Sequence, residues 1–188
     1  MADLVAYVPI VAVLSIYVAR MAEVATKRAV IEGPVHEKLT FRLFMMSGLI
    51  AAFGGIAEYV LSGMHCRWEM LAAGVVLALA SFVIRRAAIA ALGKFWSLHI
   101  EIRENHQFVR SGPFRWMRHP TYFSMILELL SAIIILGTVW TAALAFLVFI
   151  PALVMRMSKE EAALVSKFGA EYQSYQRGTP ILFPCRIP

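Results

Sequence analysis

The residues best suited to chemistry lie in a basic and aromatic stretch, residues 106–122, and in a short charged run, residues 156–161. In the first stretch Pro120 suits the first turn of a helix, and His119 is the flanking residue. The start of such a helix presents unpaired backbone N–H groups and a positive dipole end, which together favour a carboxylate or a phosphate. A basic segment that contacts anionic lipid headgroups is the alternative interpretation.

In the charged run, Arg156 and Glu160 lie one helical turn apart on the same face if the helix of the preceding apolar run continues through them. The structural interpretation is a snorkelling arginine with a glutamate one turn away, although Arg before Glu is the weaker order for such a pair. Beyond Glu160, apolar residues at roughly helical spacing, interrupted by Gly169, predict an amphipathic helix or lid at the surface (Ala163, Leu164, Phe168, Tyr172 and Tyr175).

Two carboxylates lie inside long apolar runs. Glu128 is near the middle of residues 122–136, and Glu58 is near the end of residues 43–61. Exposing an ionisable side chain to lipid costs about 2.5 kcal/mol or more, so such a residue is a functional candidate by default. The structural alternative is a protonated carboxyl group that is hydrogen-bonded to a neighbouring helix. For Glu128 the functional and the structural role stay open, while for Glu58, near the membrane interface, the structural role is favoured.

The elements that must position these residues are apolar helices. Of the 188 residues 60% are hydrophobic and only 16% are charged, and the mean hydropathy is +0.70, which is not the composition of a soluble globule. Five runs predict membrane spans: residues 4–19, 43–61, 70–84, 122–136 and 139–155. Because only Gly137 and Thr138 separate the last two, they should form a tight helical hairpin. The predicted fold is all-α and polytopic.

Charge predicts the orientation of these spans. Seventeen of the 18 Lys and Arg residues fall in residues 20–42, 85–119 and 156–188, and only Arg67 lies on the other side. Cytoplasmic loops carry the excess of basic residues, so we expect the N-terminus outside and the C-terminus in the cytosol. The net charge of +6 then reports orientation, and nucleic-acid binding is not expected. Cys66 and Cys185 would lie on opposite faces, and their spacing predicts neither a disulfide nor a metal site.

The C-terminal half carries several motifs together. They are Gly93-Lys-Phe-Trp96, His106-Gln-Phe-Val109, Gly112-Pro-Phe114, Arg118-His-Pro-Thr-Tyr122, Arg156 with Glu160-Glu161, and Phe168-Gly-Ala-Glu-Tyr172. With them the chain resembles the isoprenylcysteine carboxyl methyltransferase family, which overlaps with bacterial phospholipid methyltransferase-like proteins. The absence of the additional N-terminal spans of eukaryotic members resembles the shorter prokaryotic forms.

This resemblance implies a membrane-embedded methyltransferase that uses S-adenosylmethionine and lacks the soluble Rossmann fold. The sequence agrees, since no GxGxxG follows a strand pattern. We expect a single domain over residues 1–188, with three spans in residues 1–92 and the methyltransferase core in residues 93–188. The cofactor pocket should face the cytosol.

The resemblance also implies roles for individual residues. Glu160 would bind the methionine part of the cofactor. Arg156 would face the acceptor as the catalytic and substrate-binding residue. Apart from the resemblance, the position of Glu128 inside an apolar run makes it a further expected substrate-binding residue. Phe114 stands where the family commonly has tyrosine. The rest of the cofactor pocket would be lined by His106, Gln107, Phe108, Val109, Phe114, His119, Pro120, Thr121 and Tyr122.

Methyl transfer from a sulfonium is an in-line displacement, so orienting the acceptor supplies much of the acceleration. A carboxylate acceptor needs no general base, whereas a phenol, thiol or amine would need one, for which Glu128 and His119 are candidates. The predicted reaction is carboxyl O-methylation of an isoprenylcysteine-like, lipophilic acceptor that enters from the membrane. The alternatives are N- or O-methylation of a phospholipid headgroup or of a small lipophilic amine, phenol or thiol, and a non-enzymatic lipid-binding membrane protein.

Overall fold

The fold is a bundle of long helices. The computed structural model describes residues 2–26, 39–93 and 108–183, and every regular element within these ranges is a helix. The predicted all-α class is therefore confirmed for this part of the chain. In chain order the elements are α1 (Ala2–Val5), α2 (Val8–Ala25), α3 (Leu39–Leu49), a π-helix (Ile50–Gly54), α4 (Gly55–Leu61), α5 (Trp68–Leu92), a 3-10 turn (Gly112–Arg115), α6 (Pro120–Leu136), α7 (Trp140–Phe168) and α8 (Ala170–Gly178).

Three of the described helical segments are long and apolar enough to cross a membrane: Leu39–Leu61, Trp68–Leu92 and Trp140–Phe168. The apolar helix Pro120–Leu136 is shorter. Large apolar side chains cover the outer faces of the bundle, among them Val76, Leu79 and Val83 on α5 and Leu147, Ile150 and Val154 on α7. A soluble protein does not expose so much contiguous apolar surface, and the chain is an integral membrane protein. The count of five spans stays a prediction.

The first predicted span differs in its boundaries. The helix is interrupted after Val5, restarts at Val8 and continues to Ala25, six residues beyond the predicted end. Pro9 explains the restart, because proline fits the first turn of a helix and restricts the residue before it. The extension carries Arg20 and Glu23 into the bundle, where both side chains find partners.

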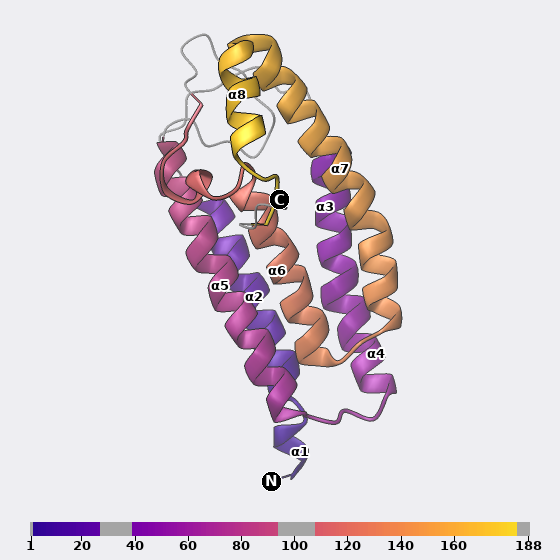
Figure 1. Ribbon diagram of the computed structural model, residues 1–188. Coiled ribbons are helices and arrows are strands. Elements are labelled where there is room, and N and C mark those ends of the chain that lie inside the picture. The colour runs from indigo at the N-terminus through magenta and orange to yellow at the C-terminus, as the bar shows by residue number, and fades with distance from the viewer. Residues whose placement is uncertain (1, 27–38, 94–107, 184–188) are drawn as a thin grey trace.

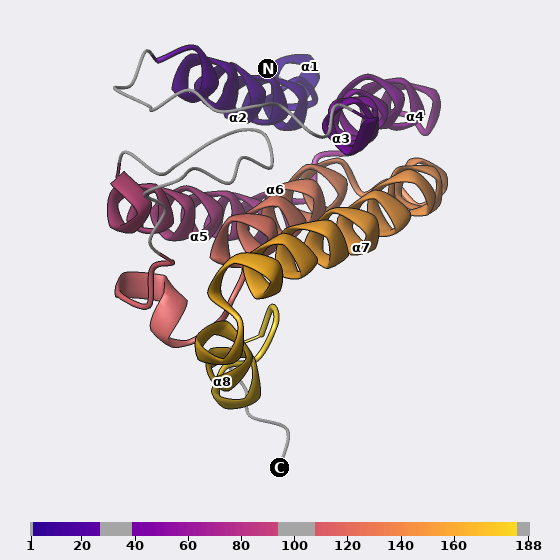
Figure 2. The ribbon, with the colours of Figure 1, turned by 90° about the horizontal axis from the view of Figure 1, so that it is seen from above.

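Helix α6 is the centre of the bundle. Figure 2 shows α6 between α5 and α7, with α2 and α3 on one side of this row and α8 on the other. On one face of α6, Leu129 and Ile133 pack with Phe44 of α3 and Phe149 of α7. On another face, residues of α6 pack with α2, α4 and α5 (Ala132, Ile135 and Leu136 against Val13, Tyr59 and Leu71). Groups on different faces of α6 therefore face different neighbouring helices.

The predicted hairpin joins α6 to α7. Gly137 ends α6 with φ +65°, a left-handed conformation that glycine adopts readily. The carboxylate of Glu58 then accepts three hydrogen bonds from the start of α7, from the amides of Val139 (2.9 Å), Trp140 (3.2 Å) and Thr141 (2.7 Å). An ionised carboxylate suits the positive end of a helix dipole. The structural role favoured for Glu58 is confirmed, and it is a helix cap. The expected protonated carboxyl is corrected to a carboxylate, because both oxygens accept from backbone amides.

Candidate active site

Helix α7 extends well past its apolar part and brings charged residues to the end of the bundle where α8 lies (Figure 1). It runs without a break from Trp140 to Phe168, as the predicted continuation requires. Gly169 ends it with φ +54° and ψ −129°, a backbone conformation that strains any residue with a side chain. The chain turns there into α8 (Ala170–Gly178), so that the predicted interruption at Gly169 is confirmed.

Arg156 and Glu160 of α7 meet at the hydroxyl of Tyr122 in the first turn of α6. Arg156 Nε donates to the Tyr122 oxygen at 2.9 Å, and the hydroxyl donates to Glu160 Oε2 at 2.6 Å. Arg156 Nη1 also donates to Thr40 Oγ1 of α3 at 3.3 Å. Arg156, Tyr122 and Thr40 are buried, and Glu160 is half-buried. We call this chain of hydrogen bonds, Thr40–Arg156–Tyr122–Glu160, the relay.

Glu161 links three elements beside the relay. Its Oε1 atom lies 3.0 Å from His119 Nε2 and 2.9 Å from Arg118 Nη1, and its Oε2 accepts from Gln176 Nε2 of α8 at 3.0 Å. The His119 ring lies against the ring of Tyr122, with centroids 5.4 Å apart. Glu161 therefore fixes the start of α6 to α7 and α8, a role that its place in the motif did not predict.

The chain after α8 returns to the start of α6. The amides of Arg118 and His119 donate to the carbonyl oxygens of Pro180 (2.9 Å) and Ile181 (3.0 Å). These two amides, which precede the helix, are therefore already paired. The Nε atom of Arg118 is different: it is buried and lacks a hydrogen-bond partner among the described residues.

Aromatic rings cover the site on the side of α8. Phe108 packs against Phe168, Tyr172 and Tyr175, with ring centroids 5.0, 5.4 and 5.7 Å away. The Tyr175 hydroxyl donates to the carbonyl oxygen of Phe114 at 2.6 Å, and burial raises the pKa of Tyr175 to about 12. The hydroxyl is therefore a neutral donor at physiological pH.

The remaining predicted pocket residues lie around the same end of α6. Phe114 and Pro120 are buried, and Val109 and Thr121 are half-buried. His106 and Gln107 lie outside the described residues. The structure thus brings Phe108, His119, Tyr122, Arg156 and Glu160 to one end of the bundle, as a shared site requires.

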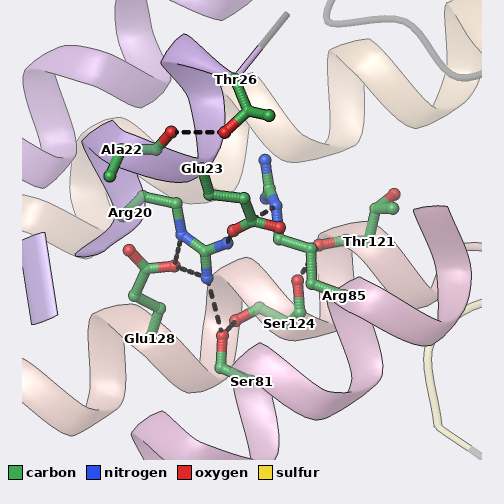
Figure 3. Close-up of polar contacts among 9 residues, drawn as sticks. All are labelled: Arg20, Ala22, Glu23, Thr26, Ser81, Arg85, Thr121, Ser124 and Glu128. Atoms are coloured by element: carbon green, nitrogen blue, oxygen red, sulfur yellow. Dashed lines mark hydrogen bonds and ion pairs between the residues drawn. The ribbon is translucent and has the colours of Figure 1, made fainter. Parts of the chain in front are cut away.

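Glu128 points elsewhere. Its Oε2 atom accepts from Arg20 Nε at 2.6 Å and lies 2.5 Å from Arg20 Nη2, so the carboxylate faces α2 (Figure 3). Arg20 also pairs with Glu23 and donates to Ser81 Oγ of α5 at 3.3 Å. Tyr122, by contrast, packs with Phe44 and Phe149 of α3 and α7. The structure does not bring Glu128 to Arg156.

Most of the buried polar atoms around Arg20 have hydrogen-bond or ion-pair partners. Ser81 Oγ donates to the carbonyl oxygen of Ser124 at 2.7 Å, the Arg20 guanidinium lies 4.6 Å from the centroid of the Phe82 ring, and Arg85 Nε lies 3.8 Å from Glu23 Oε2. Two arginines thus oppose two glutamates, and buried charges persist when they are paired in this way. A clue was present in the sequence, since Arg20 and Glu23 lie three residues apart just after the first apolar run.

The comparison with protein families agrees with this arrangement. Residues 73–166 match the model of the isoprenylcysteine carboxyl methyltransferase family, and this range includes α6, the hairpin and the charged part of α7. The chain belongs to the isoprenylcysteine carboxyl methyltransferase family. The match contains the relay residues Tyr122, Arg156 and Glu160, together with His119 and Glu161.

The curated relatives of this chain include metal resistance proteins and protein-S-isoprenylcysteine O-methyltransferases. A cobalt-zinc-cadmium resistance protein, CzcN, of Cupriavidus metallidurans is 30% identical over 75% of this chain and 66% of its own length. The protein-S-isoprenylcysteine O-methyltransferase of Schizosaccharomyces pombe is 30% identical over 54% of this chain and 44% of its own length. Protein-S-isoprenylcysteine O-methyltransferase B of Arabidopsis thaliana is 28% identical over 73% of this chain and 71% of its own length. The chain thus spans less than two thirds of some of these relatives.

Proposed function

We propose that the protein is an S-adenosylmethionine-dependent methyltransferase that methylates the carboxylate of a lipophilic, isoprenylcysteine-like acceptor. The relay carries the proposal, because it brings a cation and an anion to one tyrosine hydroxyl at the end of an apolar bundle. Arg156 suits the acceptor carboxylate, and Glu160 suits the amine of the cofactor. Membership of the family and the methyltransferases among the relatives support the same reaction.

The residues of the site fit the chemical parts of the cofactor. Half-buried Glu160 offers a carboxylate to the amine, and Arg118 offers to the cofactor carboxylate a buried Nε donor that has no partner among the described residues. The rings of Phe108, Phe114 and Tyr122 would give the adenine an apolar wall and the sulfonium a cation-tolerant one. The bound cofactor would supply the electrophilic methyl group.

The protein then contributes by binding the cofactor and the acceptor and by orienting the acceptor carboxylate. Arg156 is fixed by Tyr122 and Thr40, so its guanidinium enters the reaction already oriented. A carboxylate acceptor brings its own nucleophilic oxygen. Glu128, a candidate base for other acceptors, is held by Arg20 on a different face of α6. This arrangement favours a carboxylate over an amine, a phenol or a thiol.

We also propose that the bundle crosses the membrane five times, with the N-terminus outside, the C-terminus in the cytosol and the site at the cytosolic face. Exposed Trp68 and Trp140 lie at the starts of α5 and α7, and exposed Trp116 precedes α6. Tryptophan is enriched at both membrane interfaces, so these residues suit the two borders of the bilayer. The lipophilic acceptor would enter from the bilayer, and membrane lipids would surround the outer faces.

The reaction can be tested with the purified protein and cofactor carrying a labelled methyl group. Three acceptors with the same lipid tail should be compared: a prenylcysteine acid, an amine and a phenol. Base-labile methyl ester should form from the acid alone. Methylation of the amine or phenol instead would replace the proposed acceptor, and the absence of saturable S-adenosylmethionine binding would favour a non-enzymatic lipid-binding protein.

The proposed contact between Glu160 and the cofactor amine gives a direct prediction. Glu160→Ala should weaken S-adenosylmethionine binding by about 1.5 to 3 kcal/mol, the usual loss for a charge-assisted hydrogen bond. Glu171→Ala is the matched control, because Glu171 is exposed and pairs with Arg110 outside the relay. Calorimetric titration of both variants measures the effect. Unchanged affinity in a folded Glu160→Ala protein would remove Glu160 from the cofactor site.

A further inference from the structure

We propose that the Tyr122 hydroxyl couples the two halves of the site, so that cofactor bound at Glu160 strengthens the hold of Arg156 on an anionic acceptor. This inference rests on the proposed function and adds an energetic link between its two binding steps. It gives Tyr122 a task beyond lining the pocket: Tyr122 is a positioning residue for Arg156.

The geometry makes Tyr122 the shared partner of both charged groups. Its oxygen accepts from Arg156 Nε at 2.9 Å while its hydrogen is donated to Glu160 Oε2 at 2.6 Å. The Tyr122 side chain is buried among Phe44, Leu129 and Phe149, which restrict its movement. A change in the hydrogen bonding of Glu160 or of Arg156 therefore alters the hydrogen bond that the other residue makes with this hydroxyl.

The direction of the coupling follows from how hydrogen bonds polarise one another. In the empty site, the Glu160 carboxylate attracts the hydroxyl hydrogen, which makes the Tyr122 oxygen a stronger acceptor for Arg156. The cofactor amine would compensate the charge of Glu160 and weaken this attraction. Arg156 is then held less firmly by Tyr122, and its guanidinium becomes a better partner for an acceptor carboxylate.

The coupling must act in both directions. If the cofactor raises acceptor affinity by a given factor, the acceptor raises cofactor affinity by the same factor. Couplings between two sites in one protein commonly amount to about 5-fold or more. The consequence for function is a preferred order, in which the site holds a lipid acid firmly only when the methyl donor is present.

The experiment measures this factor without turnover. S-adenosylhomocysteine keeps the amine and lacks the transferable methyl group, so it can be titrated with and without a prenylcysteine acid. We expect each ligand to raise the affinity of the other about 5-fold or more in the unaltered protein. In Tyr122→Phe, which keeps the ring and loses the hydroxyl, the factor should fall at least about threefold, because only the direct field between Glu160 and Arg156 persists.

Three further variants separate coupling from a general loosening of the site. Tyr175→Phe removes a hydroxyl at the same end of the bundle and should leave the coupling factor unchanged. Thr40→Val removes the hydrogen bond between Thr40 Oγ1 and Arg156 Nη1 without altering the Tyr122 hydroxyl, so acid affinity should change while coupling persists. Glu160→Gln removes the charge and mimics the compensated state, so the acid alone should bind more tightly than to the unaltered protein.

The outcomes are distinct. Independent binding of the two ligands, an unaltered factor in Tyr122→Phe, or weaker acid binding in Glu160→Gln would each overturn the inference while leaving the proposed function in place. Failure of either ligand to bind the unaltered protein would overturn the proposed function, and the inference with it.

Discussion

At the scale of single residues, two buried charged side chains have different surroundings. Arg156 donates to two neutral oxygens, those of Tyr122 and Thr40, which fix the position of its guanidinium. Glu128 is opposed directly by Arg20. A charge that is positioned by neutral groups can act on a ligand, whereas a charge that is matched by its neighbour serves mainly to join two helices.

Arg156→Lys tests the first of these roles. Lysine keeps the charge but loses the planar fork, so it cannot hold Tyr122 and Thr40 while it aims two carboxylate oxygens. Turnover of a lipid-tailed acid should fall by about 100-fold or more, while S-adenosylmethionine affinity changes little. Steady-state kinetics with parallel calorimetry measures both quantities. A variant as active as the unaltered protein would contradict the role of Arg156.

Glu128→Gln tests the role of Glu128 as the partner of Arg20 that joins α6 to α2. The amide removes one of the two negative charges that oppose Arg20 and Arg85, which leaves one buried positive charge in excess, so the free energy of unfolding should fall by about 3 kcal/mol. Methyl transfer to an acid by the folded fraction should stay within a few-fold, because this reaction requires no base. Thermal unfolding in detergent and turnover per folded molecule are the two measurements. Loss of turnover at unchanged stability would instead make Glu128 a base, and the acceptor would not be a carboxylate.

These residues also show how far sequence reasoning reaches. Helical spacing placed Arg156 and Glu160 on one face, and Pro120 placed Tyr122 in the first turn of α6, so this side of the relay could be predicted. Thr40 and Arg20 could not, because they lie 116 and 108 residues away from their partners. Periodicity indicates which residues share a face but not which helix that face will meet.

At the scale of helices, the ends of the elements were harder to predict than their cores. The α6–α7 hairpin and the break at Gly169 could be predicted from turn residues. The pairing of the start of α6 with Pro180 and Ile181 could not, because it uses only backbone atoms of a segment without a motif. Backbone hydrogen bonds can be made by almost any residue type and so cannot be recognised in the sequence, whereas turns and caps favour particular side chains.

The cap formed by Glu58 gives a prediction at this scale. Glu58→Ala leaves three amides at the start of α7 without their acceptor and should lower the free energy of unfolding by about 1 to 2 kcal/mol. Affinity for the cofactor should not change, because the cap lies at the opposite end of α7 from the relay. Glu69→Ala, at an exposed position in the first turn of α5, is the control. Thermal unfolding of both variants compares them, and equal midpoints would contradict the capping role.

At the scale of the whole molecule, the apolar bundle has two ends that differ in their content of Lys and Arg. The relay and Glu161 lie at the end of the bundle that carries α8, and the Glu58 cap lies at the other end (Figure 1). Seventeen of the 18 Lys and Arg residues belong to segments assigned to the first of these sides. A bundle whose Lys and Arg residues gather at one end has a preferred orientation in a membrane. This end would then share a compartment with the cofactor.

The two cysteines can test this orientation. Cys66 lies in the connection between α4 and α5, at the end of the bundle that is poor in Lys and Arg, and Cys185 lies outside the described residues near the C-terminus. With five spans, a membrane-impermeant maleimide should label Cys66 in right-side-out vesicles and Cys185 in inverted ones. Cys66→Ser and Cys185→Ser assign each signal to one residue, and detergent-solubilised protein shows that both thiols can react. Labelling of both cysteines from the same side would contradict five spans. It would mean that an even number of crossings separates α4 from the C-terminus, and then at least one of α5, α6 and α7 does not cross the bilayer.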